Sequence, residues 1–250
     1  MTGKVGEVFK PATLSRLMGI VGELLITFGA IVLLFLAWQL WINNAVVAGQ
    51  QHKASQELSQ QWSTDKDKTA SAPATEDFGP APAFAGAGEG AKFATIYIPR
   101  LGADSTRVVK NSIDLPTVLN NGYFGHYPDT QWPGQPGNFA LAVHRTNWGS
   151  PFGDAPKLQV GDKIYVETAD GYYTYAFRNY EFVLPSAVDV LLPVPGTNES
   201  PGDQSILTIT TCNPLLGDAE RMIVYSVLES WRPHSAGPPA EMAKTQKVES

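Results

Sequence analysis

Residues 24–42 of this 250-residue chain form an apolar run, LLITFGAIVLLFLAWQLWI, in which Gln39 is the only clearly polar side chain. As a helix, the 19 residues of this run are about 28 Å long, close to the thickness of the hydrocarbon core of a bilayer. A soluble fold has to bury such a helix, whereas a membrane accepts it directly. The run therefore predicts a transmembrane anchor, with Trp38 and Trp41 at the membrane interface.

The charges beside this run predict its orientation. Lys4, Lys10 and Arg16 precede it, whereas Lys53 is the only basic residue in the twenty residues that follow. Positive charge favours the cytoplasmic side, so residues 1–23 are predicted to be cytoplasmic and the rest of the chain to lie outside. A cleaved signal peptide is the alternative. We favour an uncleaved anchor, because the run is long for a signal peptide and AWQLWINNAVVAG is a poor cleavage site.

Two segments after the anchor lack the pattern of a packed domain. Residues 43–91 are predicted to form a flexible extracytoplasmic tether, with at most a few helical turns in their polar first part. Their second part, SAPATEDFGPAPAFAGAGEGA, has Pro or Gly every few residues and should be extended. Residues 233–250 are similar and are predicted to be a disordered tail. Residues 92–232 remain as a single domain.

Strand signals dominate this domain, and short helices are predicted only at 112–120 and 186–191. Asp170-Gly171 predicts a tight hairpin turn. Runs rich in β-branched and aromatic residues lie at 93–99, 105–110, 138–145, 162–168, 172–185, 205–211 and 221–231. Seven or eight short strands with few helices predict a mainly β domain, either a barrel or a sandwich.

Charge and cysteine content exclude several kinds of function. The formal net charge is −6 and no sustained basic block exists, so nucleic-acid binding is a poor hypothesis. A single cysteine rules out an intrachain disulfide and a Cys-rich zinc site. The four histidines do not pair at metal-ligand spacing, and the chain has no P-loop or GxGxxG turn.

The single cysteine, Cys212, is a candidate nucleophile. It ends the predicted strand ILTITT and opens the loop NPLLGDAE. Most free cysteines are small buried hydrophobes, and this is the alternative for Cys212. However, an unpaired thiol oxidises outside the cytoplasm, and a strand end beside a loop is well placed to meet a substrate. A cysteine nucleophile needs a base or a cation beside it.

His144 is the candidate base, because it also ends an apolar strand and opens a polar loop. A single histidine is more often structural, and this is the alternative for His144. His126, in GHYP, is the only competitor, since His52 and His234 lie in the predicted tether and tail.

Arg221 is the candidate cation, nine residues after Cys212 at the start of the next strand. If the intervening loop folds back, the guanidinium returns to the cysteine end of the sheet, where it could stabilise an oxyanion. The alternative is a solvated charge paired with Glu220 or Asp218. The order His, Cys, Arg is more specific than any one of the three residues.

These residues carry a resemblance to a known family. The sequence resembles a sortase, the membrane-anchored cysteine transpeptidase of Gram-positive bacteria, in TITTC (208–212), in the arginine nine residues later and in AVHR (142–145). The resemblance extends over about residues 93–231, and GHYPDTQWPGQPGNFALAVHRTNWGSPF (125–152) looks most like class E of actinobacteria. Ile209 stands where the motif usually has Leu or Val.

The resemblance implies a fold and an activity. The fold would be a closed eight-stranded β-barrel with a few short helices after one transmembrane helix. Cys212 would be the nucleophile, His144 the general acid/base and Arg221 the cation that stabilises substrate and oxyanion. The enzyme would cut a sorting motif between Thr and Gly, hold the acyl half as a thioester, and pass it to an amine of a cell-wall precursor such as lipid II. Its partners would be surface proteins that carry the motif.

The resemblance also implies a substrate preference and no cofactor. Class E members typically prefer Leu-Ala-any-Thr-Gly, and Tyr127 is expected where it can hydrogen-bond the backbone N–H that Ala keeps and Pro lacks. Thr211 is expected to line the same groove. The alternatives are a surface tyrosine and an ordinary strand threonine. No metal or organic cofactor is expected, and no acidic cluster suggests calcium.

Two other functions remain as alternatives. An L,D-transpeptidase should carry a histidine two residues before its cysteine, but that position is Thr210. A non-catalytic, membrane-anchored β-barrel that binds wall components predicts a buried and unreactive Cys212.

Overall fold

The computed structural model describes residues 11–38, 42–63, 77–102 and 105–242 of the chain. The chain divides into two compact units, residues 1–43 and 44–250.

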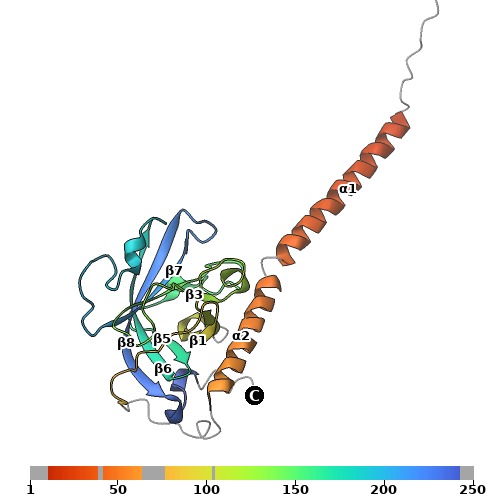
Figure 1. Ribbon diagram of the computed structural model, residues 1–250. Coiled ribbons are helices and arrows are strands. Elements are labelled where there is room, and N and C mark those ends of the chain that lie inside the picture. Colours follow the sequence, from red (N-terminus) through yellow and green to blue (C-terminus); the bar gives the residue numbers. More distant parts are fainter. Residues whose placement is uncertain (1–10, 39–41, 64–76, 103–104, 243–250) are drawn as a thin grey trace, which may run out of the picture. The chain divides into compact units, whose positions relative to one another are not determined.

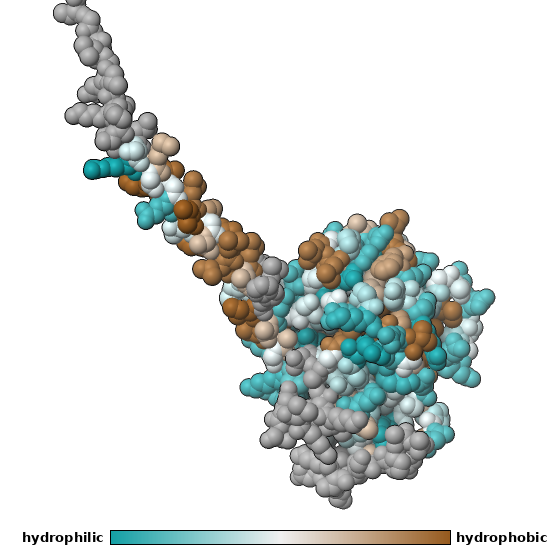
Figure 2. All heavy atoms as spheres, turned by 180° about the vertical axis from the view of Figure 1, so that it is seen from behind, coloured by the Kyte–Doolittle hydropathy of each residue, from teal (hydrophilic) through white to brown (hydrophobic). Residues whose placement is uncertain are grey.

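The first unit contains one long helix, α1 (Pro11–Ala37). Its stretch Ser15–Ala37 is long and apolar enough to cross a membrane. Leu, Ile and Phe side chains along it are exposed, and Figure 2 shows this helix as mostly hydrophobic. The helix therefore begins before the predicted anchor of residues 24–42 and overlaps it up to Ala37, while residues 39–41 lie outside the described part of the chain.

The second unit is a closed barrel of eight strands, which confirms the predicted mainly β fold class (Figure 1). Around the barrel the strands follow the order β1-β2-β3-β4-β7-β8-β6-β5. Their bounds are β1 (Lys92–Tyr97), β2 (Arg107–Lys110), β3 (Phe124–His126), β4 (Gly137–Ala142), β5 (Lys163–Thr168), β6 (Gly171–Val183), β7 (Ser205–Asn213) and β8 (Glu220–Pro233).

Seven of these strands lie where the sequence predicts them, and β3 is the one that the sequence analysis missed. It has only three residues, too few for a periodic pattern to show. The predicted hairpin joins β5 to β6, with Thr168 paired to Gly171. The two predicted helices are single 3₁₀ turns, η4 and η6. The short helices that lie wholly within the described residues of the unit include η2 (Pro99–Leu101), η4 (Leu119–Asn121), η5 (Ala155–Lys157), η6 (Val188–Leu191) and η7 (His234–Ala236).

The barrel interior follows from the alternation of side chains along each strand. Phe139 and Leu141 of β4, and Leu207 and Ile209 of β7, are fully buried in one core cluster. The alternate residues, such as Thr208 and Thr210 on β7, therefore face the outside of the barrel wall. The two faces of β4 and β7 thus carry different kinds of residue.

The prediction that residues 43–91 form a flexible tether is wrong for the first part of this segment. Residues Asn43–Trp62 form one helix, α2, and its Gln51 and Ser55 are almost completely buried. Figure 1 shows α2 beside the barrel, and Gln51 Oε1 accepts a hydrogen bond from the Val108 N–H of β2 (3.3 Å). A tether that hydrogen-bonds the barrel in this way is part of the domain.

The coil before β1 and the segment after β8 also pack on the barrel. Phe84 joins the core cluster, and its N–H donates to the Pro133 carbonyl (2.9 Å). His234 and Met242 are buried, so the prediction of a disordered tail is wrong up to residue 242. Residues 64–76 and 243–250 of the predicted tether and tail lie outside the described residues.

Candidate active site

Three neighbouring strands carry the predicted catalytic residues to one place. Cys212 near the end of β7 is the direct cross-strand partner of Arg221 on β8. On the other side, β7 pairs with β4 in parallel, with Ala142 opposite Thr210. Two residues further along come His144, after the end of β4, and Cys212 on β7. Residues two apart share a face of a strand, so Cys212 and its cross-strand partner Arg221 lie on the outer face, and His144 follows the end of the strand next to them.

Two hydrogen bonds hold Val143, the residue between Ala142 and His144, to β7. The Val143 N–H donates to the Thr210 carbonyl (3.0 Å), and the Thr211 hydroxyl donates to the Val143 carbonyl (2.9 Å). The chain next to His144 is therefore fixed against the strand that carries Cys212.

Cys212 itself is half-buried. The non-catalytic alternative predicts a buried residue at this position, and Cys212 is not in the buried class.

The His144 ring is oriented by Asn120, which the sequence analysis did not single out. Nε2 of His144 lies 2.8 Å from Oδ1 of Asn120. An amide oxygen can only accept, so Nε2 carries the proton and Nδ1 is left as the basic nitrogen. Burial lowers the pKa of His144, which favours the neutral ring. A neutral imidazole with a fixed tautomer is suited to accept a proton.

The Arg221 guanidinium is held by its own loop. One of its terminal nitrogens, Nη1, donates to the carbonyl oxygens of Asp218 (2.8 Å) and Glu220 (3.0 Å). The alternative from the sequence was an ion pair with one of their carboxylates. Among the described residues no such ion pair forms, because the Glu220 carboxylate accepts from Asn213 Nδ2 instead (2.7 Å). The cation at this site is therefore not neutralised by those carboxylates.

A second arginine, Arg145, stabilises the end of β7 from the inner side. It is buried, and its Nη1 donates to the Cys212 carbonyl (3.4 Å) and to Asn213 Oδ1. These bonds order the backbone that carries the thiol. Arg145 directly follows the predicted base in AVHR, but nothing in the sequence distinguished it from a solvated charge.

The two predicted substrate-binding residues have different positions. The Tyr127 hydroxyl lies 2.9 Å from Thr210 Oγ1, on the outer face that also carries Cys212. The Tyr127 ring packs against Ala142, Val118 and Leu119. Thr211 is only 2% exposed and belongs to the inner face, with its hydroxyl bound to the Val143 carbonyl. The residue that lies next to Tyr127 is therefore Thr210, and Thr211 does not line the same face.

The competing histidine, His126, is inside the barrel. It is fully buried and contacts the rings of Trp132 and Phe139, and its Nδ1 lies 2.9 Å from Asn111 Oδ1. Burial lowers its pKa to about 4. This neutral, packed histidine has a structural position. Among the described residues, no group of three or more metal-ligating side chains is found.

Comparison with known proteins agrees with this geometry. The family described as "Sortase domain" matches residues 96–229, more than half of the chain. Sortase SrtE1 of Streptomyces coelicolor is 36% identical over 225 residues, which are 88% of this chain and 59% of that protein. The chain therefore spans about three fifths of the length of this curated relative.

Two solved structures are similar as well. The SrtA sortase from Actinomyces oris superposes with a TM-score of 0.63 at 30% identity, over 67% of this chain and 96% of that one. The crystal structure of Sortase E1 from Streptomyces coelicolor with a tripeptide in the active site gives a TM-score of 0.56 at 36% identity, over 61% and 97% of the two chains.

The closed barrel and the aligned His, Cys and Arg thus define a protein of the sortase class. The family match and these relatives make the assignment definite, and the chain belongs to the sortase family.

Proposed function

We propose that this chain is a cysteine transpeptidase that cleaves a C-terminal sorting motif between Thr and Gly and transfers the acyl half to an amine. The observation that supports this proposal is the strand register, which pairs Cys212 with Arg221 on one side and, on the other, pairs Ala142 with Thr210, each two residues before His144 and Cys212. A nucleophile, a base and a cation on adjacent strands are the groups that acyl transfer requires.

In the first half-reaction neutral His144 takes the Cys212 thiol proton on Nδ1, and the resulting thiolate attacks the Thr carbonyl carbon. A C–S bond forms and the carbonyl oxygen gains negative charge, which the Arg221 guanidinium stabilises. The intermediate collapses as the C–N bond breaks, and protonated His144 gives its Nδ1 proton to the leaving Gly amine. The product is a thioester on Cys212. Asn120 would keep the ring in the orientation that this transfer needs.

In the second half-reaction the acceptor amine attacks the thioester. His144 Nδ1 takes the proton from the amine, the new amide C–N bond forms, and the C–S bond breaks. The proton on Nδ1 then returns to the Cys212 sulfur, which restores the thiol and the neutral ring. Nothing in this cycle changes oxidation state, so the chain's own residues suffice and no cofactor is needed. Thr211 would act indirectly, by holding the end of β4 to β7 beneath the reacting groups.

The substrates follow from the same proposal. Surface proteins that end in Leu-Ala-any-Thr-Gly or Leu-Pro-any-Thr-Gly would be cleaved, and a cell-wall precursor such as lipid II would supply the amine. Class E of Gram-positive actinobacteria is the favoured subtype, supported by the likeness to Sortase E1, whose crystal structure has a tripeptide in its active site. Tyr127 and the neighbouring Thr210 would contact the second residue of the motif.

The membrane arrangement is also a proposal. The α1 helix would anchor the chain in the cell membrane, with the preceding residues in the cytoplasm and the barrel outside, supported by the basic residues before the span. Protease added to intact protoplasts should then remove the barrel. A protected barrel would contradict this orientation.

The Cys212→Ala variant tests the proposed function. Cleavage of a sorting-motif peptide should fall to background, because the nucleophile is absent, while the melting temperature stays near that of the wild type. Mass spectrometry of the wild type should detect an acyl adduct, and the variant should have none. Cleavage by the variant at close to the wild-type rate would refute the cysteine mechanism.

A further inference from the structure

The helix that follows the anchor, α2, is attached to the barrel at three points along its length. Asn44 Oδ1 accepts from the Gly149 N–H near the start of the helix (3.0 Å). Gln51 Nε2 donates to the Asn121 carbonyl in the middle (2.7 Å). Ser59 Oγ donates to Glu167 Oε1 near the end (2.7 Å). Three separated attachments fix the orientation of a rod.

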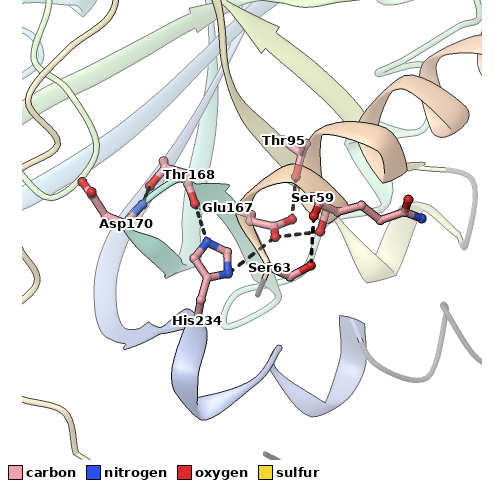
Figure 3. Close-up of polar contacts among 8 residues, drawn as sticks. Ser59, Ser63, Thr95, Glu167, Thr168, Asp170 and His234 are labelled. Atoms are coloured by element: carbon pink, nitrogen blue, oxygen red, sulfur yellow. Dashed lines mark hydrogen bonds and ion pairs between the residues drawn. The ribbon is translucent and has the colours of Figure 1, made fainter. Parts of the chain in front are cut away.

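The attachment at the end of α2 is a buried polar network (Figure 3). Glu167 of β5 is only 2% exposed, and Thr95 of β1 donates to its second carboxylate oxygen (3.2 Å). Nδ1 of His234, from the segment after β8, lies 4.0 Å from the same carboxylate. Figure 3 shows the Ser59, Thr95 and His234 side chains converging on Glu167. The end of α2 is thus bound to a rigid part of the barrel wall.

The other two attachments involve the loops that flank His144. The first loop is η4, which contains Asn120, the hydrogen-bond partner of the His144 ring. Gln51 of α2 binds the carbonyl of the very next residue, Asn121. A shift of α2 would therefore move the group that orients the imidazole.

The second loop begins three residues after His144 and is strained. Asn147, Trp148 and Ser150 all have positive φ angles, of 58°, 48° and 43°. Such conformations cost about 1–3 kcal/mol each and persist only where surrounding contacts impose them. Gly149, in the middle of this loop, is held by Asn44 of α2 through its N–H.

A glycine lets α2 and the two loops meet. Gly122, with φ +75°, follows η4, and a Cβ at this position would lie 2.6 Å from the Trp148 carbonyl oxygen and 2.8 Å from Val47 Cγ1 of α2. These distances are too short for real contacts. The junction is therefore closely packed around a residue without a side chain.

We infer that α2 is a positioning element for His144, which it holds in place through Asn44, Gln51 and the two flanking loops. This inference rests on the proposed function. The inference also gives a role to the first part of residues 43–91, which the sequence predicts to be a flexible tether. Only five residues separate α1, which ends at Ala37, from α2, which begins at Asn43, so the helix next to the membrane anchor also supports the catalytic histidine.

The full-length protein in detergent provides the test, because the barrel core cluster contains no residue of α2 and should survive changes in this helix. Gln51→Ala removes the buried contact, and Gln50→Ala is the matched control on the exposed side of the same helix. For Gln51→Ala, kcat should fall roughly 10- to 100-fold with KM for the sorting peptide unchanged, because small displacements of a catalytic group have effects of this size. Gln50→Ala should retain the wild-type kcat.

Asn44 provides a second, independent pair of variants. Asn44→Ala removes the acceptor for the Gly149 N–H and should lower kcat, whereas Asn44→Asp keeps an acceptor oxygen and should restore most of it. If Gln51→Ala does not fold, this pair still decides the question. Equal kcat values for Gln51→Ala and Gln50→Ala, or for Asn44→Ala and wild type, would overturn the inference. An inactive wild-type protein would count against the proposed function and not against the role of α2.

Discussion

One histidine lies on the inner face of the barrel wall and another on the outer face, and their surroundings differ. His126 on β3 faces inward, is fully buried and contacts aromatic rings. His144, just after the end of β4, faces outward, is half-buried and contacts only one polar partner that the structure assigns to its ring, Asn120. The two strands are neighbours in the barrel. The two histidines are therefore distinguished by the environment that each face provides and not by residue type.

The inward-facing and outward-facing residues of β7 differ in the same way. Inward-facing Leu207 and Ile209 belong to the core, and inward-facing Thr211 binds the Val143 carbonyl. Outward-facing Thr210 and Cys212 lie beside Tyr127 and Arg221. Substitutions on the inner face should therefore change stability, and substitutions on the outer face should change turnover.

The largest effect on turnover is expected when the two histidines are compared. His144→Ala should lower kcat/KM by about 10²–10⁴-fold, because general acid–base catalysis commonly contributes that much. His126→Ala should lower the melting temperature and leave the turnover of the folded fraction near that of the wild type. Peptide cleavage and thermal unfolding, measured on the same samples, check both. A larger catalytic loss in His126→Ala would mean that the two histidines have been assigned the wrong roles.

Arg221 should show the next largest effect. Arg221→Ala should lower kcat by roughly 10²–10³-fold, the loss typical of removing one oxyanion-stabilising group. Arg221→Lys should recover only part of this, because an ammonium lacks the planar fork of the guanidinium. Single-turnover acylation rates measure the effect directly. Full activity in the lysine variant would mean that charge alone is needed at this position.

The inner histidine should also make stability depend on pH. The pKa of His126 is about 4 in the folded protein, against about 6.5 in an unfolded chain, so the unfolded state binds the proton first as the pH falls. The contribution of neutral His126 to the free energy of unfolding is therefore fully present above about pH 6.5 and is lost as the pH falls from 6.5 to 4. This contribution is about 3 kcal/mol.

His126→Gln isolates this contribution. The variant should be less stable at pH 7, but its stability should fall less steeply between pH 6.5 and 4, which denaturant unfolding at several pH values measures. His144→Gln is the control on the outer face, and it should flatten the dependence less because His144 is only half-buried. Identical slopes in wild type and His126→Gln would contradict the position given to this histidine.

Most of the barrel could be predicted from sequence because its strands have clear alternation. In the run 205–211 the inner residues Leu207 and Ile209 alternate with the outer residues Thr208 and Thr210, and Cys212 follows directly. Strand β3 was missed because Phe124–His126 is too short for a period, so its pairing with β4 determines it. The sequence predicts Cys212, His144 and Arg221 near strand ends, and the register pairs Cys212 with Arg221 and carries β4 to within two residues of His144.

The role of α2 could not be predicted, and the reason is physical. Its sequence NNAVVAGQQHKASQELSQQW is polar and has no apolar stripe that would signal packing. The helix instead attaches through Asn44, Gln51 and Ser59, whose amides and hydroxyl look like those of any solvated helix. Asn120 was missed for the same reason, because only the folded chain brings it to His144.

The smallest effect concerns the motif preference on the outer face. A motif with Ala in its second position keeps a backbone N–H that Pro lacks, and the Tyr127 oxygen, next to Thr210, could accept that hydrogen bond. A net value of about 0.5–1.5 kcal/mol for this hydrogen bond corresponds to a roughly three- to tenfold preference for Leu-Ala-any-Thr-Gly over Leu-Pro-any-Thr-Gly.

The Tyr127→Phe variant keeps the packed ring and removes the hydroxyl. It should therefore narrow the ratio of the kcat/KM values for the two peptides, mainly by slowing cleavage of the Ala peptide. Tyr123, which packs on the same cluster, provides the matched control, and Tyr123→Phe should leave the ratio unchanged. An unchanged ratio in Tyr127→Phe would remove this tyrosine from substrate recognition, and a wild-type preference for Pro would contradict the class E assignment without affecting the role of Cys212.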